Sequence, residues 1–491
     1  MDALLGIDLG TTRCKAAVCS PDGALLGEST VGCPLIKPGP GIVEQDATLW
    51  WDLTQQVVRQ AVDAAQMGSD FVRALSVSSQ GISFVPVDER GEPLGNAINW
   101  LDTRATLQAE SILSRFSEEE LFRLSGKRAS PAYVLPKLLW LAANQPDVYR
   151  RAHKFLMAHD YLMFKLTGLF VTDHSMASGS LLHDITGLDW RSELTEAFGV
   201  AVEQLPEIRW AGTCLGHLKP EAAEALGVSD QVVVAVGGQD QKCAALGASI
   251  RSGAVTISLG TASAITCLTS RPLLDDQRRI PVFPFLVPGH WDLEGVVGTA
   301  AGALHWLRET FFPGQSYEEL DTLARESPPG AMGVCFYPHL GGATSPHWRA
   351  GVRGAFLGLS LAAGSRDIVR SVLEGVAFQI RSNIEVIEAL GMPVEEVILF
   401  GGGARSSLWP QLICNITGKP ATCTSMVDVA NWGACLLAGA AAGLFGKDLL
   451  DRPPCKGIST HWEPQPEAAA KYADICAHYR LLESKLLERE E

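Results

Sequence analysis

LLGIDLGTTRCKAAV, residues 4–18, is the stretch that decides the fold, and its core phrase returns as LGTA at residues 259–262. The apolar run before Gly10 predicts a buried strand, and residues 13–18 predict a partner strand that runs back beside it. The later stretch VTISLGTASAITCL repeats this plan around Gly260. Two hairpins of one design, near the starts of the two halves of the chain, predict a fold built from two related halves.

Each predicted hairpin tip has a glycine followed by hydroxyl residues. Such a tip exposes backbone N–H groups and side-chain donors with no bulky group in front of them, which suits phosphate oxygens. One tip alone would be interpreted as an ordinary turn, but two together predict that a triphosphate is held from opposite sides. The predicted phosphate-binding residues are Gly10, Thr11, Thr12, Arg13, Gly260 and Thr261.

Length and composition limit the classes of protein that the chain can belong to. With 491 residues, 47% of them hydrophobic and 19% charged, it is long enough for about two to four folded domains. Its net charge of −15 would repel a nucleic-acid backbone and an anionic membrane surface, so we expect neither as a partner. The 12 cysteines include no CxxC pair and no secretory segment opens the chain, which indicates a cytoplasmic protein with reduced thiols. The sequence leaves the oligomeric state open, with a homodimer as one option.

The first half is predicted to be a sheet flanked by helices. A β-branched run at 232–236 predicts a strand buried on both faces. The other predicted elements of this half are strands over 4–9, 13–18, 24–30 and 72–78, a helix over 47–65, and helical segments over 136–143 and 148–166.

The second half repeats this organisation. The segment 430–446 is rich in alanine and glycine and too short to span a bilayer, so it predicts a buried helix. The tail from Glu467 is predicted to be an exposed charged helix. The other predicted elements are the LGTA hairpin, helices over 300–309 and 365–387, a strand over 397–400 and a helix from Leu408. No Pro-, Gly- or Ser-rich linker separates the halves, and we place the boundary near residue 245.

Two aspartates follow predicted buried strands. Asp8 ends the first strand, where its carboxylate could hold Mg²⁺ directly or through water, and a turn-capping role is the alternative. Asp240 follows the run VVVAV and a double glycine, at a strand end where open α/β sheets place their ligands. A helix N-cap is the alternative role for Asp240, and the two roles are compatible in geometry.

A third glycine-rich segment is a candidate nucleotide site. Gly401, Gly402, Gly403 and Ala404 follow a predicted buried strand and precede a helix, where an adenine or ribose could lie against bare backbone. Taken alone, a structural contact between helix and sheet is an equally good interpretation. No GxxxxGK[ST] occurs in the chain, which excludes a P-loop mechanism.

A series of motifs runs in order from residue 4 to about residue 446. They are GIDLGTT, VEQDATLWW, WLDTRA, HDYLMFKLTG, TDHSMASGSLLHDI, GGQDQ, LGTA and GGGARSSLWPQLICNITGKP. In this order they resemble FGGY-type carbohydrate kinases, of the actin, hexokinase and heat-shock ATPase superfamily. The resemblance implies an α/β fold with two ribonuclease-H-like domains around a catalytic cleft. Domain 1–245 would bind sugar and phosphate and carry the base, and domain 246–491 would bind ATP.

The resemblance also implies a reaction. It is the ATP-dependent phosphorylation of a sugar hydroxyl by in-line transfer, with Mg²⁺ held by Asp8 and Asp240 and with Asp240 as the general base. The motifs are most similar to those of xylulokinases, so D-xylulose, giving D-xylulose 5-phosphate, is the leading substrate. Ribulose, glycerol or another polyol, and a gluconate-like aldonate are the alternatives. An actin-like or chaperone-like ATPase without a sugar substrate is the alternative of another class.

The acceptor pocket departs from the family pattern. Gly81 and Ile82 stand where xylulokinases carry a Met-His pair and glycerol kinases an Arg-Glu pair, which predicts a roomier and less polar wall. Gln241 is closer to the Asp-Gln pair of glycerol kinases. Asp102 and Arg104 would lie near the sugar, with a surface ion pair as the alternative. The substrate-binding residues that the resemblance implies are Gln80, Gly81, Ile82, Trp100, Asp102, Arg104 and Gln241.

Overall fold

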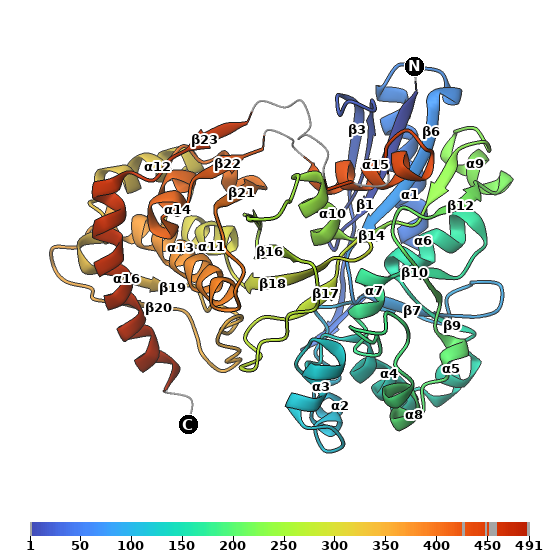
Figure 1. Cartoon of the computed structure of the whole chain (residues 1–491), viewed down its shortest axis with the longest axis horizontal. Helices are drawn as coiled ribbons and strands as arrows, with labels where there is room; N and C mark the ends of the chain where they lie inside the picture. The colour runs from blue at the N-terminus through green and yellow to red at the C-terminus, as the bar shows by residue number, and fades with distance from the viewer. Residues whose placement is uncertain (1, 425–427, 447–448, 451–458, 489–491) are drawn as a thin grey trace.

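The computed structural model describes residues 2–424, 428–446, 449–450 and 459–488, which form two α/β bodies side by side (Figure 1). The sheet of the first body has the strand order β12-β13-β6-β1-β2-β3, with β14 also paired to β6. Its strands are β1 (Ala3–Leu9), β2 (Arg13–Cys19), β3 (Leu25–Gly32), β6 (Val72–Ser79), β12 (Cys214–His217), β13 (Val233–Ala235) and β14 (Gly238–Gln239).

Strand β1 is the centre of this sheet, and every one of its residues is buried. It pairs antiparallel with β2, and β2 with β3, which confirms the predicted meander. It also pairs parallel with β6, where Asp8 lies opposite Ser78. On the other side of β6, Gly238 is opposite the same Ser78, two residues before Asp240. The sheet therefore brings the two predicted carboxylates to one edge.

The second body repeats this plan with the strand order β17-β18-β16-β15-β21-β22-β23. Strand β15 pairs antiparallel with β16 and parallel with β21, as β1 pairs with β2 and β6. The predicted second hairpin is thereby confirmed, and its tip lies beside the end of β21. The strands are β15 (Ala254–Ser258), β16 (Ser263–Thr269), β17 (Val282–Pro284), β18 (Trp291–Val297), β21 (Glu396–Phe400), β22 (Ala421–Cys423) and β23 (Thr460–Trp462).

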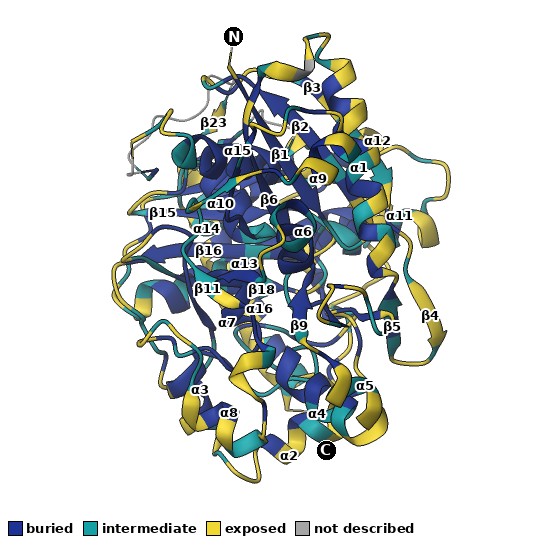
Figure 2. Ribbon diagram, turned by 90° about the vertical axis from the view of Figure 1, so that its right-hand side faces the viewer, coloured by how far each residue is buried: buried dark blue, intermediate teal, exposed yellow. Residues whose placement is uncertain are grey.

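Helices cover both sheets, so that the strands are mostly buried beneath partly exposed helices (Figure 2). The helices before residue 250 are α1 (Ala47–Ala64), α2 (Thr106–Ile112), α3 (Glu118–Ser125), α4 (Val134–Asn144), α5 (Pro146–Arg151), α6 (Ala158–Thr167), α7 (His174–Ser178), α8 (Ser192–Phe198), α9 (Pro220–Leu226) and α10 (Asp240–Gly247). Those after it are α11 (Ala301–Phe311), α12 (Tyr317–Glu326), α13 (Ser365–Ala389), α14 (Trp409–Thr417), α15 (Val429–Ala441) and α16 (Pro466–Leu487).

Three smaller sheets complete the fold. A five-stranded sheet contains β4 (Ile36–Gly39), β5 (Ile42–Gln45), β7 (Phe84–Val87), β8 (Ala97–Ile98) and β9 (Lys154–Met157). Two strand pairs are β10 (Val171–Asp173) with β11 (Glu207–Arg209), and β19 (Cys335–Tyr337) with β20 (Ala355–Leu357). The prediction of helical segments over 148–166 is wrong for the middle of this range, where β9 pairs with β7.

Helix α15 confirms the buried helix predicted within 430–446, and it packs against the first body although it comes late in the chain (Figure 1). Glycines make the contact possible. A Cβ on Gly6 of β1 would lie 2.1 Å from the carbonyl oxygen of Asn431, and one on Gly433 would lie 1.9 Å from that of Cys243 in α10. Because α15 returns to the first sheet, the two bodies are not two uninterrupted halves of the chain.

The prediction that the tail is simply an exposed helix is wrong. Helix α16 buries Tyr472, Cys476, Tyr479 and Glu483 against the second body. Glu483 accepts a hydrogen bond from Gln379 Nε2 at 2.5 Å and lies 3.3 Å from His339 Nε2. The charged composition of this segment predicts an exposed helix. It does not reveal that one face of the helix buries a carboxylate together with aromatic residues.

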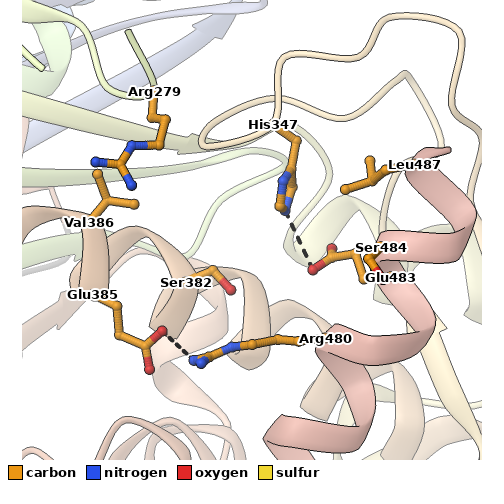
Figure 3. Close-up of a pocket in the computed structure, with 9 residues that line it drawn as sticks. All are labelled: Arg279, His347, Ser382, Glu385, Val386, Arg480, Glu483, Ser484 and Leu487. Atoms are coloured by element: carbon orange, nitrogen blue, oxygen red, sulfur yellow. Dashed lines mark hydrogen bonds and ion pairs between the residues drawn. The ribbon is translucent and has the colours of Figure 1, made fainter. Parts of the chain in front are cut away.

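Helix α16, helix α13 and the loop around His347 enclose a pocket of about 350 Å³ that contains none of the predicted site residues (Figure 3). Most of its charged groups are paired with one another, and Arg279 pairs with Asp275 outside the pocket. Arg480 contacts Glu385, and His347 Nε2 lies 3.4 Å from Glu483. The charges in this pocket are therefore largely neutralised by ion pairs, and the pocket is part of the packing around α16.

We expect Glu483 to contribute stability that is lost in acid. Burial alone would raise its pKa, but contacts with His339, His347 and Gln379 lower the pKa to about 2. A folded-state pKa below the unfolded one stabilises the fold at neutral pH, and that contribution disappears as the pH falls from about 4.5 to about 2.

Urea unfolding of Glu483→Gln should therefore show a loss of about 1 to 3 kcal/mol at pH 7 that shrinks steadily below pH 5. Glu467→Gln, exposed at the start of the same helix, is the control and should change stability by less than about 0.5 kcal/mol. A loss for Glu483→Gln that is the same at pH 7 and pH 3 would contradict this role.

Candidate active site

Asp8 is buried near the C-terminal end of the central strand β1. It accepts a hydrogen bond from Ser78 Oγ at 2.8 Å, and Lys15 Nζ lies 3.5 Å from its other oxygen and 2.9 Å from Asp428. Burial raises the pKa of Asp8 to about 6, opposed by Lys15 and supported by the charge of Asp428. Asp8 thus bonds to the neighbouring strand β6 rather than capping its own turn.

Asp240 is the first residue of α10, but its predecessor caps the helix. The side-chain oxygen of Gln239 accepts from the backbone N–H groups of Gln241 at 3.0 Å and Lys242 at 3.2 Å. The N-cap alternative for Asp240 is therefore wrong. Burial, followed by the negative charge of Asp8, raises the pKa of Asp240 to about 7. The residue remains half-buried and thus accessible to a small molecule.

The donor chemistry of Asp8 and Asp240 fits Mg²⁺. Burial disfavours the charge of each carboxylate, and the charge of Asp8 further raises the pKa of Asp240, so a cation bound by both would relieve this cost. Mg²⁺ takes oxygen ligands and commonly uses one or two carboxylates together with waters and substrate phosphates. Among the described residues, no group of three or more His, Cys, Asp or Glu side chains is placed to hold a metal ion.

Lys242 ties the helix of Asp240 to the second body. Its ammonium group is fully buried, contacts Glu294 of β18 and lies 3.4 Å from Asp292 of the same strand. It also lies 3.8 Å from the ring centre of Phe283. The start of α10 is therefore held by both bodies.

Both predicted phosphate tips reach the surface. In the first hairpin Gly10 N–H donates to Arg13 at 2.9 Å, and Thr12 and Arg13 are exposed. In the second, the carbonyls of Gly260 and Thr261 accept from the start of α11 at 2.9 and 2.8 Å, and Thr261 is exposed. The tips are thus fixed at their bases with accessible ends.

The glycines of GGGARS differ in what surrounds them. Gly401 has φ +91°, which only glycine adopts readily, and Gly403 N–H donates to the Leu259 carbonyl at 2.9 Å. A Cβ on Gly403 would lie 2.8 Å from Leu259 Cβ and 2.9 Å from Trp409. A Cβ on Gly402 would meet nothing within 4 Å. Gly403 therefore serves the contact between helix and sheet. Gly402 leaves an open face that a nucleotide could use.

Two valine variants separate these roles. Gly402→Val should raise the KM for ATP by about tenfold or more and leave the fold intact, because its side chain enters open space where the adenosine is predicted to lie. Gly403→Val should lower the melting temperature, because it collides with Leu259 and Trp409. Steady-state kinetics and thermal melting of both variants test this. An unchanged KM for ATP in Gly402→Val would remove GGGARS as the nucleotide site.

Most polar residues of the predicted acceptor pocket form hydrogen bonds or ion pairs within the protein. Gln80 is buried and donates to Gln45 Oε1 at 2.8 Å. Asp102 is fully buried and Arg104 Nη2 lies 2.7 Å from it and 2.7 Å from Glu44. The surface-ion-pair alternative for Asp102 and Arg104 is therefore wrong, since the pair is internal. The polar groups of Gln80, Asp102 and Arg104 thus already have partners within the protein.

Three other predicted acceptor residues remain available to a ligand. Trp100 is 38% exposed, and its indole N–H donates to Thr11 Oγ1 at 2.8 Å, which joins the acceptor region to the first phosphate tip. Ile82 has φ +69°, an uncommon conformation for a β-branched residue. The side-chain oxygen of Gln241 is buried without a hydrogen-bond partner in the described structure, a cost that a sugar hydroxyl could offset.

The structure collects the predicted residues into two groups. The first contains Asp8, the Gly10–Arg13 tip, the acceptor residues and Asp240. The second contains Gly260, Thr261 and the 401–404 segment. No hydrogen bond or ion pair between described residues joins the two groups directly. Each group lies on its own body, and the sequence prediction that two tips face one triphosphate stays a prediction.

Sequence reasoning missed four polar residues of this region. Lys15 stands directly opposite Asp8 in the register of the first hairpin, so the predicted pairing of strands could have found it. Asp428 and Glu294 lie on elements that are distant in the sequence, so no local sequence pattern predicts that they belong to this site. Gln239 is a rare capping residue, and only the structure shows its side chain turned over the helix start.

Solved structures with the same fold identify the class of protein. The ligand-bound xylulose kinase from Lactobacillus acidophilus superimposes with a TM-score of 0.93 at 27% identity, covering 99% of this chain and 98% of that one. The gluconate kinase from the same species gives a TM-score of 0.93 at 27% identity, covering 99% of each chain. The fold is that of the two-domain, actin- and hexokinase-like sugar kinases.

The family follows from the sequence comparisons. The model for the FGGY family of carbohydrate kinases matches with its N-terminal domain at residues 3–247 and its C-terminal domain at residues 255–442. The xylulose kinase of Staphylococcus epidermidis strain RP62A is 30% identical over 445 residues, 90% of this chain and 89% of that protein. The chain belongs to the FGGY family of carbohydrate kinases.

Family membership decides between the classes considered from the sequence. The protein is a phosphotransferase that acts on carbohydrate, and kinases of this family use ATP as the phosphoryl donor. The actin-like and chaperone-like alternatives are therefore wrong. No helix in the described ranges is long and apolar enough to cross a membrane.

Proposed function

We propose that this kinase phosphorylates a neutral ketose or polyol, with D-xylulose as the first candidate and Asp240 as the general base. The observation that carries the proposal is the Asp240 carboxyl, half-buried at a sheet edge beside Asp8 with its pKa raised to about 7. A general base works best when its pKa lies near the working pH.

In the proposed reaction, the residues of the site divide between proton transfer, phosphate binding, adenosine binding and Mg²⁺ binding. Asp240 accepts the proton of the acceptor hydroxyl as that oxygen attacks the γ-phosphorus of ATP in line with the leaving group. The tips at Gly10–Arg13 and Gly260–Thr261 bind the phosphates through N–H and hydroxyl groups, and Gly402 supplies the face for the adenosine. Asp8, together with Asp240, would hold Mg²⁺, which when bound neutralises charge on the phosphates.

The charges around the acceptor region support a neutral sugar over an aldonate. At Asp240 the charges of Asp8 and Glu294 each act more strongly than the opposing charge of Lys242, and this negative field would oppose the carboxylate of a gluconate-like substrate. The cations Arg104 and Lys242 are already paired with buried carboxylates. Overall similarity does not separate the two substrates, since the xylulose and gluconate kinase structures match equally well.

A panel of acceptors tests the substrate class. With saturating Mg-ATP, we expect kcat/KM for D-xylulose to exceed that for D-gluconate by at least about 10², the discrimination of a site that offers no partner to a charge. We also expect turnover of related ketoses such as D-ribulose and L-ribulose, because a side-chain pair at Gly81 and Ile82 is missing.

Two results would contradict the proposal. A preference for D-gluconate would assign the pocket to aldonates, and complete inactivity on all neutral ketoses and polyols would exclude the proposed class of acceptor. Selectivity for D-xylulose over the ribuloses by several powers of ten would support D-xylulose as the substrate. It would contradict the prediction that the pocket wall at Gly81 and Ile82 is roomier and less polar. ADP release with each acceptor is the measurement.

A further inference from the structure

We propose that Gln239 is a positioning residue, whose side-chain amide orients the carboxylate of Asp240 toward the acceptor hydroxyl. This inference rests on the proposed function, in which Asp240 is the base. The observation behind it is a contact of 2.5 Å from Gln239 Nε2 to Asp240 Oδ1.

The orientation of the Gln239 amide is set by its other neighbours. Its oxygen faces the backbone N–H groups of Gln241 and Lys242, at 3.0 and 3.2 Å. Both of these groups are donors only, so the oxygen must point at them and the NH₂ group must point at Asp240. One side chain thus caps α10 and donates to the base.

The rest of Gln239 is held firmly. Its backbone N–H donates to Ser175 Oγ at 3.1 Å, and it pairs with Ser79 in the parallel ladder between β14 and β6. Its Cγ would lie 3.1 Å from a Cβ placed on Gly81. Glycine at position 81 therefore leaves room for the Gln239 side chain.

These contacts distinguish the two oxygens of the base. Oδ1 of Asp240 accepts from Gln239 Nε2 and from Gln241 N–H, at 2.5 and 2.8 Å. Oδ2 accepts no hydrogen bond from another described residue. The geometry leaves Oδ2 as the oxygen that takes the proton from the acceptor, with the carboxylate plane fixed by two donors on Oδ1.

Two near-isosteric variants separate orientation of the base from capping of the helix. Gln239→Glu keeps an oxygen for the N–H groups of Gln241 and Lys242 but has no N–H to offer Asp240. Gln239→Met keeps the length of the side chain and loses both functions. If Gln239 orients the base, both variants lose kcat by about ten- to a hundredfold, the usual effect of deleting a hydrogen bond to a charged group. In Gln239→Glu the KM for ATP should stay at the wild-type value, and the melting temperature should fall less than in Gln239→Met, because the oxygen that caps α10 is kept while the new carboxylate repels Asp240.

Gln56→Glu, on the exposed side of α1, is the control for the added charge and should retain wild-type activity. Gln239→Glu or Gln239→Met with kcat within twofold of wild type would overturn the inference. So would a loss of kcat in Gln239→Glu accompanied by a fall in melting temperature as large as that of Gln239→Met, since this would mean a cap and nothing more. Failure of the underlying function is recognised separately, because Asp240→Asn would then remain active.

Discussion

Asp240→Asn is expected to lower kcat for sugar phosphorylation by about 10² to 10⁴, the usual loss when a general base is removed. The amide has nearly the shape of the carboxyl but does not accept a proton at neutral pH. It also keeps an oxygen that can accept from Gln241 N–H, at 2.8 Å in the wild-type chain. We therefore expect the variant to fold and to bind ATP but to be slow in the chemical step.

Single-turnover rates and melting temperatures with and without ATP provide the measurement. Without Mg²⁺, the thermal shift produced by ATP should be the same in Asp240→Asn as in the wild type, because the adenosine face and the phosphate tips are unchanged. Asp230→Asn, exposed before β13, is the matched control with the same loss of charge and should be fully active. Activity of Asp240→Asn within a few-fold of wild type would refute its role as the base.

The residues that sequence reasoning predicted well share a local cause. Asp8 and Gly10 follow from a strand and a tight turn, which depend on neighbouring residues, and the hairpin at Gly260 repeats the same local rule. The run VVVAV predicts a buried strand, which the structure shows as β13, and this places Asp240 after a strand end. Local patterns of this kind carry enough information to locate the edge of a sheet.

The residues that it predicted poorly depend on contacts between distant segments. Asp102 and Arg104 lie two residues apart and looked like a surface pair, yet Val43 N–H donates to Asp102 at 2.7 Å and Glu44 contacts Arg104. Glu483 is buried for the same reason, by partners more than 100 residues earlier in the chain. Burial of a charge is decided by where its partners come from, which periodicity does not record.

The position of Asp240 depends on both ends of this long-range network. Lys242 joins the start of α10 to β18 of the second body, and α15 packs along the same helix from the other direction. Two glycines interlock at that second contact. A Cβ on Gly247 of α10 would lie 2.0 Å from the carbonyl oxygen of Val429, and one on Gly433 of α15 would lie 1.9 Å from that of Cys243. Backbone meets backbone here, so neither side can yield by a change of rotamer.

Gly433→Val is therefore expected to cost at least about 3 kcal/mol of unfolding free energy, the upper end of overpacking effects, because the helices must separate. Urea unfolding and soluble yield give the measurement. Gly32→Val in β3 is the control, since its Cβ would meet nothing within 4 Å, and it should fold normally. The fraction of Gly433→Val that does fold should also be less active, because moving α15 moves α10 and with it Asp240. A variant as stable and active as the wild type would mean that the close contact between α10 and α15 does not hold the base in place.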